Sequence, residues 1–154
     1  KMVLPGDRVA EVETLLNHGS GMAALSGMEN DVKAMRKAAS DGNERAALAL
    51  KIFTRSVSKA MGAFCWLLGG LDAIVFAGGI GEHDAQSRRE IVHGLEALGV
   101  NLDEGLNQAV TGGVQQISSP FSQTALLIVP AQEDEMIAVH VEHMARNAAQ
   151  ALPR

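Results

Sequence analysis

Three closely spaced glycines, Gly78, Gly79 and Gly81, give the chain bare backbone directly after a short apolar run. The run, residues 73–76, has no polar side chain, which predicts a parallel strand covered on both faces. Glycines have no Cβ atom, and α/β folds bind ligands beyond the carboxyl ends of their parallel strands. The pattern therefore predicts either a ligand-binding edge or a plain tight turn from strand to helix.

The glycines match neither of two common phosphate-binding motifs. A dinucleotide-binding fingerprint needs a third glycine three residues after Gly81, where Asp84 stands. A Walker loop needs a lysine followed by serine or threonine, and no lysine follows these glycines. The turn alone is therefore a weak indication of a phosphate site.

Other residues with chemical potential are few. Glu133 opens an acidic triplet at the start of the last expected helix, where negative charge stabilises the first turn. His140 and His143 share a helical face, but zinc sites need three or four ligands and no companion pair is present in the sequence. We therefore interpret both histidines as structural.

The spacing of apolar residues predicts a chain rich in helices and poor in strands. Helices are expected over 9–16, 31–39, 41–68, 84–98 and 133–149, with a short helix or turn near 24–27, and strands over 73–76, 114–117 and 125–129. Three strands make a small sheet for so many helices, and strand-helix-strand connections need a complete sheet. We expect that something that completes the sheet lies outside this chain.

The same spacing predicts which side chains are buried. The longest helix should begin with a capping box of Asp41 and Glu44 and end at Gly69. Its expected buried series is Leu50, Phe53, Val57, Met61, Phe64 and Leu68, and the stretch 64–67 indicates a packed rather than reactive Cys65. The helix over 84–98 should bury Ile91, Leu95 and Leu98 and stop at Gly99, and the last helix should bury Met136, Ile137, Val139 or His140, and Met144.

Composition favours one globular domain over residues 1–154. The 154 residues are 47% hydrophobic, and their net charge of −5 is spread along the chain. With one Trp, four Phe, no Tyr and no basic stripe, nucleic-acid binding is not expected. The longest nearly apolar run, 60–71, is shorter than the roughly 20 residues of a membrane helix. We therefore expect a soluble protein without membrane contact. The single cysteine excludes an internal disulfide, which favours the reducing cytoplasm.

Five segments, taken in order, resemble one known family. They are Leu25–Lys33, Asp41–Ala46, Gly69–Phe76, Gly78–Glu82 and Val129–Glu135. Together they resemble the acetate kinases, which with the propionate kinases belong to the sugar kinase, heat-shock protein and actin superfamily. Family members are more than twice as long, so the resemblance is to their carboxy-terminal part. It implies an α/β fold: part of an actin-like (ribonuclease H-like) kinase domain, with long helices packed on a small sheet.

The resemblance also implies a reaction, the reversible Mg²⁺-dependent transfer of a phosphoryl group between ATP and acetate that gives ADP and acetyl phosphate. The residues expected at the nucleotide are Gly79, Ile80, Gly81 and His83, together with Asp31, Val32 and Lys33. Glu133 falls on the family's Mg²⁺-associated glutamate, and Mg²⁺ needs only one or two carboxylates. The catalytic residues would lie upstream of Lys1, so we expect no turnover by this chain alone.

Several alternatives stay open for these residues. Asp31 could contact a ribose hydroxyl or cap its helix, and Glu133 could bind Mg²⁺ or only stabilise the first turn. Free N–H groups at the glycine turn would attract anions, but Glu82 and Asp84 would repel a multiply charged phosphate. We therefore expect the turn to hold the nucleoside and α-phosphate, with the γ-phosphate elsewhere.

The sequence departs from the family pattern at three positions. Val32 and Lys33 replace an aromatic residue and an arginine, and His83 replaces an asparagine, so contacts to the base should differ. The expected partners are a nucleotide, a short-chain carboxylic acid and a second copy of the chain. The alternatives are a kinase for propionate or another short-chain acid and, from another class, a non-catalytic nucleotide-binding or dimerisation module.

Overall fold

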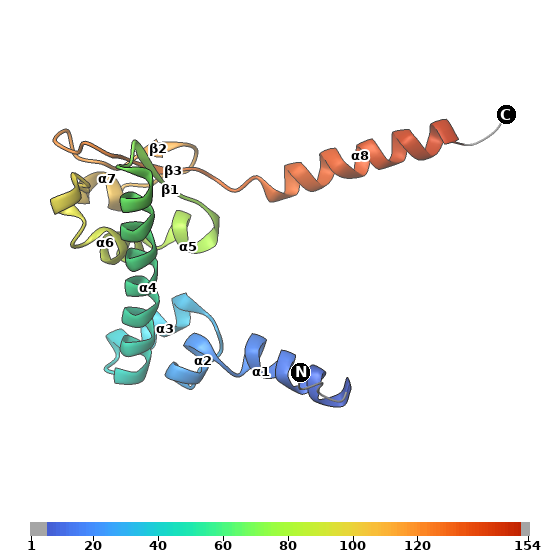
Figure 1. Cartoon of the computed structure of the whole chain (residues 1–154), viewed down its shortest axis with the longest axis horizontal. Helices are drawn as coiled ribbons and strands as arrows, with labels where there is room; N and C mark the ends of the chain where they lie inside the picture. The colour runs from blue at the N-terminus through green and yellow to red at the C-terminus, as the bar shows by residue number, and fades with distance from the viewer. Residues whose placement is uncertain (1–5, 152–154) are drawn as a thin grey trace.

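The structure, a computed structural model, describes residues 6–151 as a mixed α/β fold (Figure 1). The helices are α1 (Gly6–His18), α2 (Gly21–Ser26), α3 (Val32–Ser40), α4 (Glu44–Leu68), α5 (Gly78–His83), α6 (Ala85–Val92), α7 (Glu104–Gln108) and α8 (Glu133–Ala151), with a 3-10 turn η1 (Glu96–Leu98). The strands are β1 (Ala73–Phe76), β2 (Gln115–Gln116) and β3 (Ala125–Ile128). The predicted α/β class with long helices and a small sheet is confirmed.

The three strands form one sheet in the order β1-β3-β2. β1 and β3 are parallel, with Phe76 opposite Ile128, and β2 is antiparallel to β3. The glycine turn after β1 and the segment that leads to α8 therefore leave the sheet at the same edge. The strand predicted over 114–117 is shorter than expected, because the turn at Gly112 and Gly113 extends to the exposed Val114.

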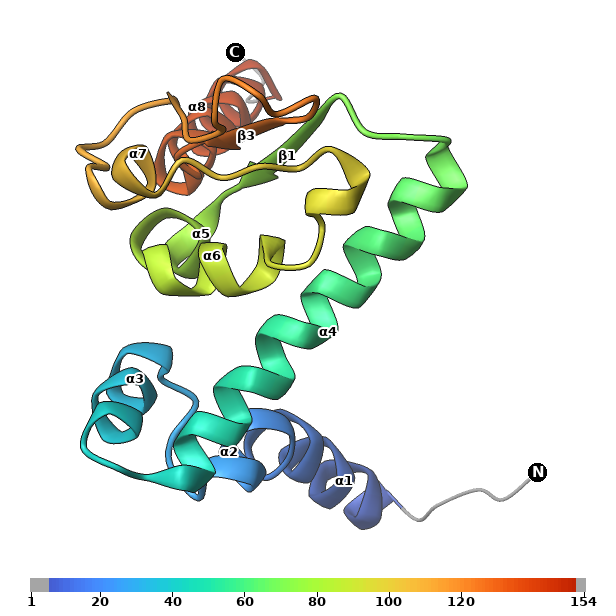
Figure 2. The ribbon, with the colours of Figure 1, turned by 90° about the vertical axis from the view of Figure 1, so that its left-hand side faces the viewer.

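Two hydrophobic clusters are packed against different parts of α4. This helix runs from α2 and α3 at one end toward the sheet at the other (Figure 2). Leu50 and its neighbours in the first half of α4 pack with Met35 of α3 and with residues of α2. Val57 and Met61, further along, pack against the cluster formed by the sheet and α6. The long helix α4 therefore fixes the position of α3 relative to the sheet.

Strand β1 is covered on one face only. Ile74 and Phe76 are buried, but Ala73 is exposed and Val75 is 52% exposed. The prediction of a strand covered on both faces is therefore wrong for this chain. The reason is that α6 packs on the side of Ile74 and Phe76, while within residues 6–151 nothing buries the opposite side.

The single helix predicted over 84–98 is broken into α6 and η1. Gly94 lies between them with φ of 90°, in the left-handed region that breaks an α-helix. Ile91 and Leu95 are buried as predicted and η1 ends at Gly99, but Leu98 is 48% exposed. The prediction for Leu98 is wrong because the break at Gly94 rotates it away from the buried face.

The predicted capping box at Asp41 and Glu44 is also wrong. Asn43 is the N-cap of α4, and its Oδ1 accepts a hydrogen bond from the Ala46 N–H at 3.0 Å. Asp41 instead follows the last turn of α3. The chain needs residues 41 and 42 to turn from α3 into α4, so α4 begins later than the sequence pattern indicated.

Long apolar faces of α4 and α8 are exposed in the described residues. Trp66 is 86% exposed, and Cys65 is only half-buried, so the packed setting predicted for this thiol is wrong. Further residues predicted to be buried are exposed as well, namely Phe64, Leu68, Met136, Ile137, Val139, His140 and Met144. In the same predicted series of α4, Leu50 is buried, and Phe53, Val57 and Met61 are half-buried. Helices α1 and α8 extend from the same side of the molecule (Figure 1). Helical spacing therefore identified apolar faces, but nothing in residues 6–151 packs against them.

In the described part of the chain, no helix combines the length and the apolar character that crossing a bilayer requires.

Candidate functional site

The glycine turn forms the first residues of α5 rather than a loop before a helix. Ala77 has extended backbone, and α5 then starts at Gly78. A Cβ atom at Gly81 would lie 3.1 Å from the backbone carbonyl carbon of Phe76, whereas a Cβ atom at Gly79 would meet nothing within 4 Å. Gly81 is therefore required by packing against β1, while Gly79 leaves open space in front of the backbone.

A buried arginine that the sequence interpretation missed supports this turn. Arg88 is 1% exposed, and its Nη1 donates hydrogen bonds to the carbonyl oxygens of Gly81 at 2.8 Å and Glu82 at 2.9 Å. Its Nε and Nη2 donate to the side-chain and backbone oxygens of Asn107, both at 2.8 Å. Burial lowers the pKa of Arg88, and the nearby Asp84 carboxylate opposes this shift. Arg88 thus holds the end of α5 against α7.

The signal for Arg88 was present in the sequence. Arg88 lies three and four positions before Ile91 and Val92, so it stands on the face of α6 that the spacing predicts to be buried. A charged residue on a buried helical face is rarely left without polar partners. The position predicts a structural arginine, although nothing in the sequence identifies Asn107 as its partner.

The two acidic residues beside the glycines both have partners. The Glu82 carboxylate accepts a hydrogen bond from the Ala131 N–H at 2.9 Å, which links the turn to the segment before α8. Asp84 is the N-cap of α6 and accepts from the N–H groups of Gln86 and Ser87. Its other oxygen accepts from the Ser87 hydroxyl at 2.6 Å and from Arg36 Nε at 3.1 Å. The charge of Asp84 is therefore compensated in place.

Arg36 joins α3 to α6. Besides Asp84, its guanidinium donates to both carboxylate oxygens of Glu90, at 2.7 and 3.0 Å, and to the Ser87 hydroxyl at 2.9 Å. Burial would lower the pKa of Arg36, but the hydrogen bonds and charges of Glu90 and Asp84 outweigh it and raise that pKa. This ion-pair network connects the helix that begins at Asp31 to the helix that follows the glycine turn.

Asp31 is the N-cap of α3. Its Oδ1 accepts from the N–H groups of Lys33 at 2.8 Å and Ala34 at 3.1 Å, so the capping role is present. Val32 is half-buried against the cluster around Met35, and Lys33 is exposed. The predicted residues of this segment therefore lie on an element that Arg36 holds against α6, which follows α5 directly.

Of the remaining predicted residues, Ile80 is half-buried in α5, and His83 and Glu133 are exposed. His83 lies at the end of α5, and Glu133 stands in the first turn of α8, three residues after Pro130. Within residues 6–151, no group of three or more His, Cys, Asp or Glu side chains could hold a metal ion. His140 and His143 are exposed on α8. Any metal role of Glu133 thus involves fewer than three such side chains of the described residues.

The junction between Arg36 and Asp84 is expected to be sensitive to acid. Burial raises the pKa of Asp84, but the hydrogen bonds from Ser87 and the charge of Arg36 outweigh it and hold that pKa below the usual 3.8. The pKa of Asp84 is therefore higher in the unfolded chain than in the folded one. The stabilisation is complete above about pH 5, and it falls as the pH drops through the pKa of the unfolded chain toward the lower pKa of the folded chain.

Denaturant unfolding at several pH values between about 5 and 3 measures this effect. The free energy of unfolding should fall more steeply with acid in the original chain than in Asp84→Asn, which cannot titrate at this position. Equal slopes for the two proteins would show that Asp84 does not carry the stabilisation.

The sequence of this chain is similar to that of one family of known proteins. A sequence profile described as the acetokinase family matches residues 4–139. Acetate kinase from Methanosarcina barkeri is 42% identical over 139 residues, which is 90% of this chain and 34% of that protein. Acetate kinase from Geobacillus kaustophilus is 41% identical over 145 residues, 94% of this chain and 36% of that protein. The chain spans about a third of the length of these curated relatives.

Solved structures give the same result. Acetate kinase from Porphyromonas gingivalis superimposes with a TM-score of 0.77 at 31% identity, covering 94% of this chain and 39% of that one. A propionate kinase from Francisella tularensis superimposes with a TM-score of 0.71 at 32% identity, covering 80% and 31%. Acetate kinase from Entamoeba histolytica is similar in fold, with a TM-score of 0.77 at 21% identity. The superposition covers 92% of this chain and 40% of that one.

Proposed function

This chain belongs to the acetokinase family, and we propose that it forms the carboxy-terminal, nucleotide-binding part of a phosphotransferase that converts ATP and acetate reversibly into ADP and acetyl phosphate. The observation that carries the proposal is the junction made by Arg36, since it holds α3, which begins at the predicted segment 31–33, against α6, which directly follows the predicted segment 79–83. Both segments lie within the residues that the family profile matches. We treat the chain as one domain-sized part of that enzyme.

The glycine turn and the start of α3 are proposed to form the two sides of the nucleoside site. Open space in front of Gly79 supports close approach of a ligand to the backbone there, with Ile80, Gly81 and His83 beside it. On the other side, Asp31, Val32 and Lys33 are proposed to contact the adenosine. Asp31 uses one oxygen as a helix cap, and its second oxygen is available to a ribose hydroxyl.

Mg²⁺ is proposed to bind mainly through the phosphates and water, with Glu133 as the protein carboxylate. This ion commonly keeps several waters and takes one or two carboxylates together with substrate phosphates. A single exposed glutamate therefore fits the ion. The hydrogen bond from Ala131 to Glu82 supports the assignment, because it ties the segment before α8 to the glycine turn. Mg²⁺ supplies charge neutralisation on the phosphates when it is bound.

Transfer of the phosphoryl group itself is proposed to need residues outside this chain. Catalysis of this type depends on positioning and on stabilising charge at the transferring group. The roles proposed for the present residues concern the nucleoside, the α-phosphate and Mg²⁺. We therefore expect this chain to bind nucleotide without catalysing turnover.

Two measurements on the purified 154-residue chain test this division of roles. Calorimetric titration with ADP in the presence of Mg²⁺ should show saturable binding, and incubation with ATP, Mg²⁺ and acetate should give no acetyl phosphate. Absence of ADP binding would reject the nucleotide site. Formation of acetyl phosphate would instead reject the claim that the catalytic groups lie elsewhere.

Propionate is the second candidate for the acid substrate, because a propionate kinase is among the similar structures. Comparison of acetate and propionate as substrates of the complete enzyme decides between them. We further propose a cytoplasmic homodimer, with the exposed apolar face of α8 supporting an interface. A non-catalytic nucleotide-binding or dimerisation module is the alternative, and it predicts no activity in any longer form of the protein.

A further inference from the structure

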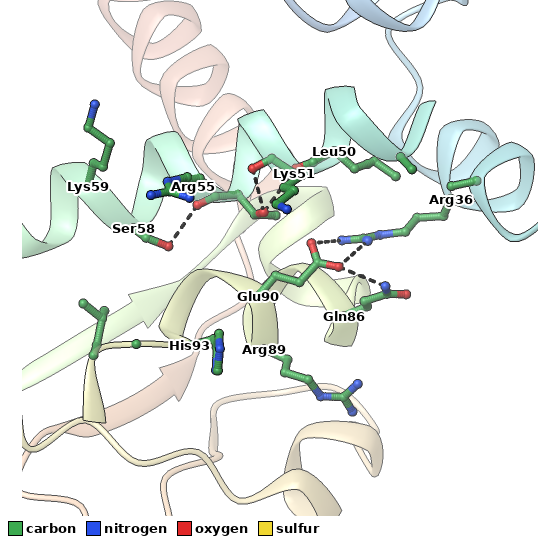
Figure 3. A pocket seen from close by; sticks show the side chains of 15 residues that line it. Arg36, Leu50, Lys51, Arg55, Ser58, Lys59, Gln86, Arg89, Glu90 and His93 are labelled. Atoms are coloured by element: carbon green, nitrogen blue, oxygen red, sulfur yellow. Dashed lines mark hydrogen bonds and ion pairs between the residues drawn. The ribbon is translucent and has the colours of Figure 1, made fainter. Parts of the chain in front are cut away.

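A cavity of about 750 Å³ lies between α3, α4 and α6 (Figure 3). Its apolar walls are formed by Ala39, Ala47, Leu50 and Leu95. This volume is in the range of sites that bind small organic molecules. The described residues that line it include neither the glycine turn nor residues 31–33, so the cavity is separate from the proposed nucleotide site.

The α4 wall of this cavity is basic. Lys51, Arg55 and Lys59 line it, and their spacing of four residues places them along one side of the helix. α4 has four basic residues and one acidic residue, although the whole chain has a net charge of −5. Like charges four residues apart destabilise a helix by a few tenths of a kcal/mol. The structure thus concentrates positive charge where it is unfavourable for the helix itself.

These cations have no acidic partner among the residues that the structure describes. Within residues 6–151, no ion pair involves Lys51, Arg55 or Lys59. Figure 3 shows the Lys59 side chain pointing away from α6, whereas Lys51 and Arg55 lie on the α4 wall facing the cavity. Lys51 and Arg55 are therefore the two cations available to a ligand in the cavity.

The acidic residue on the opposite wall does not neutralise them. Both oxygens of Glu90 accept hydrogen bonds from Arg36, and one also accepts from Gln86 at 2.9 Å. Arg89, on the same helix, donates to both oxygens of Glu104 at 2.6 and 2.7 Å. The charges of Glu90 and Arg89 are thus paired with Arg36 and Glu104, so neither residue compensates the field of Lys51 and Arg55.

We propose that this cavity binds a small organic phosphate, with its anionic group at Lys51 and Arg55 and its apolar body against Leu50 and Leu95. Phosphate is the group that best uses a guanidinium and an ammonium together, through charge and several hydrogen bonds. The apolar walls select ligands with an aromatic or aliphatic portion over inorganic phosphate. The proposal does not rest on the nucleotide site, because the two sites share none of their proposed contact residues.

Calorimetric titration of the 154-residue chain with 1-naphthyl phosphate tests the site, since this probe combines an aromatic body with a phosphate. We expect saturable binding that Arg55→Glu weakens by about tenfold or more, with smaller losses for Lys51→Gln and Arg55→Gln, which remove the charge without reversing it. Ala47→Trp, which places a large ring on the cavity wall, should also weaken binding. Inorganic phosphate should bind more weakly than the probe.

The matched control is Arg8→Glu, the same substitution on the exposed surface of α1. It should leave the affinity for 1-naphthyl phosphate unchanged, and circular dichroism should show that all variants are folded. Absence of binding, or equal losses in Arg8→Glu and Arg55→Glu, would overturn the proposal. A loss in Gly79→Val with no loss in Arg55→Glu would also overturn it, because the probe would then occupy the proposed nucleotide site.

Discussion

Substitution of Arg88 by methionine is expected to lower the free energy of unfolding by at least about 3 kcal/mol, because it leaves several buried acceptors without a donor. The carbonyl oxygens of Gly81 and Glu82 and both oxygens of Asn107 accept from this one guanidinium. Methionine has similar length but no donor, so the packing is retained while the hydrogen bonds are lost. Urea unfolding followed by circular dichroism measures the difference.

Lysine at the same position should destabilise nearly as much. Its single ammonium group cannot reach acceptors on both α5 and α7, whereas the planar guanidinium donates in several fixed directions. The comparison of Arg88→Lys with Arg88→Met therefore separates the loss of charge from the loss of geometry. If lysine restored the original stability, the directional hydrogen bonds would not be what holds the turn.

Arg89→Met is the matched control for this prediction. Arg89 is the next residue on α6, but it is exposed and pairs with the exposed Glu104. Ion pairs between exposed side chains are screened by solvent and contribute little to stability, so its loss should be small. Equal destabilisation by Arg88→Met and Arg89→Met would contradict the structural role assigned to Arg88.

Arg88 also marks how far the site could be predicted from the sequence. Its position on the buried face of α6 follows from the spacing of Ile91 and Val92. Its partner Asn107 lies 19 residues away on α7, and helical spacing contains no information about such tertiary contacts. The glycine turn was predictable from local sequence, but the side chain that supports it was predictable only as a buried arginine.

Arg36 is a second case of the same limit. Asp84 was interpreted from the sequence as a charge that would repel phosphate, because it stands beside the glycines. In the fold it caps α6 and pairs with Arg36, which is 48 residues away. Whether a charge repels a ligand depends on such partners, and these become visible only once α3 is placed against α6.

Burial was predicted well only where an element and its partner are both within the described residues. Leu50, Ile91 and Leu95 are buried as expected, because α3, α6 and the sheet surround them. Trp66 and Ile137 have the same apolar character and helical setting, but they are exposed. Spacing thus predicts that a face is apolar, whereas its burial requires the surface that covers it.

Substitution of Gly79 by valine is expected to weaken ADP binding by about tenfold or more, which corresponds to about 1.4 kcal/mol. The backbone at Gly79 faces open space, where the proposed nucleoside site lies, so an added side chain would occupy the volume of the ligand. Titration of the purified chain with ADP in the presence of Mg²⁺ gives the affinity. Gly79→Ala, with a smaller side chain, should give an intermediate loss.

The stability of Gly79→Val should stay within about 1 kcal/mol of the original, because valine is somewhat better than glycine in a helix. Apart from the adjoining residues and the backbone of α5 itself, no described atom lies within 4 Å of the added Cβ. Gly81→Ala should behave in the opposite way. Its Cβ would lie 3.1 Å from the Phe76 carbonyl carbon, and such overpacking costs about 1–3 kcal/mol of folding free energy.

The two glycines thus separate ligand contact from folding within one turn. If Gly79→Val bound ADP as tightly as the original chain, the open space at Gly79 would not be the nucleotide site, even if ADP bound elsewhere. If Gly79→Val were instead as destabilising as Gly81→Ala, the weaker binding would reflect a distorted turn. Only a loss of affinity at unchanged stability assigns Gly79 to the ligand, because no contact among the described residues requires a glycine there.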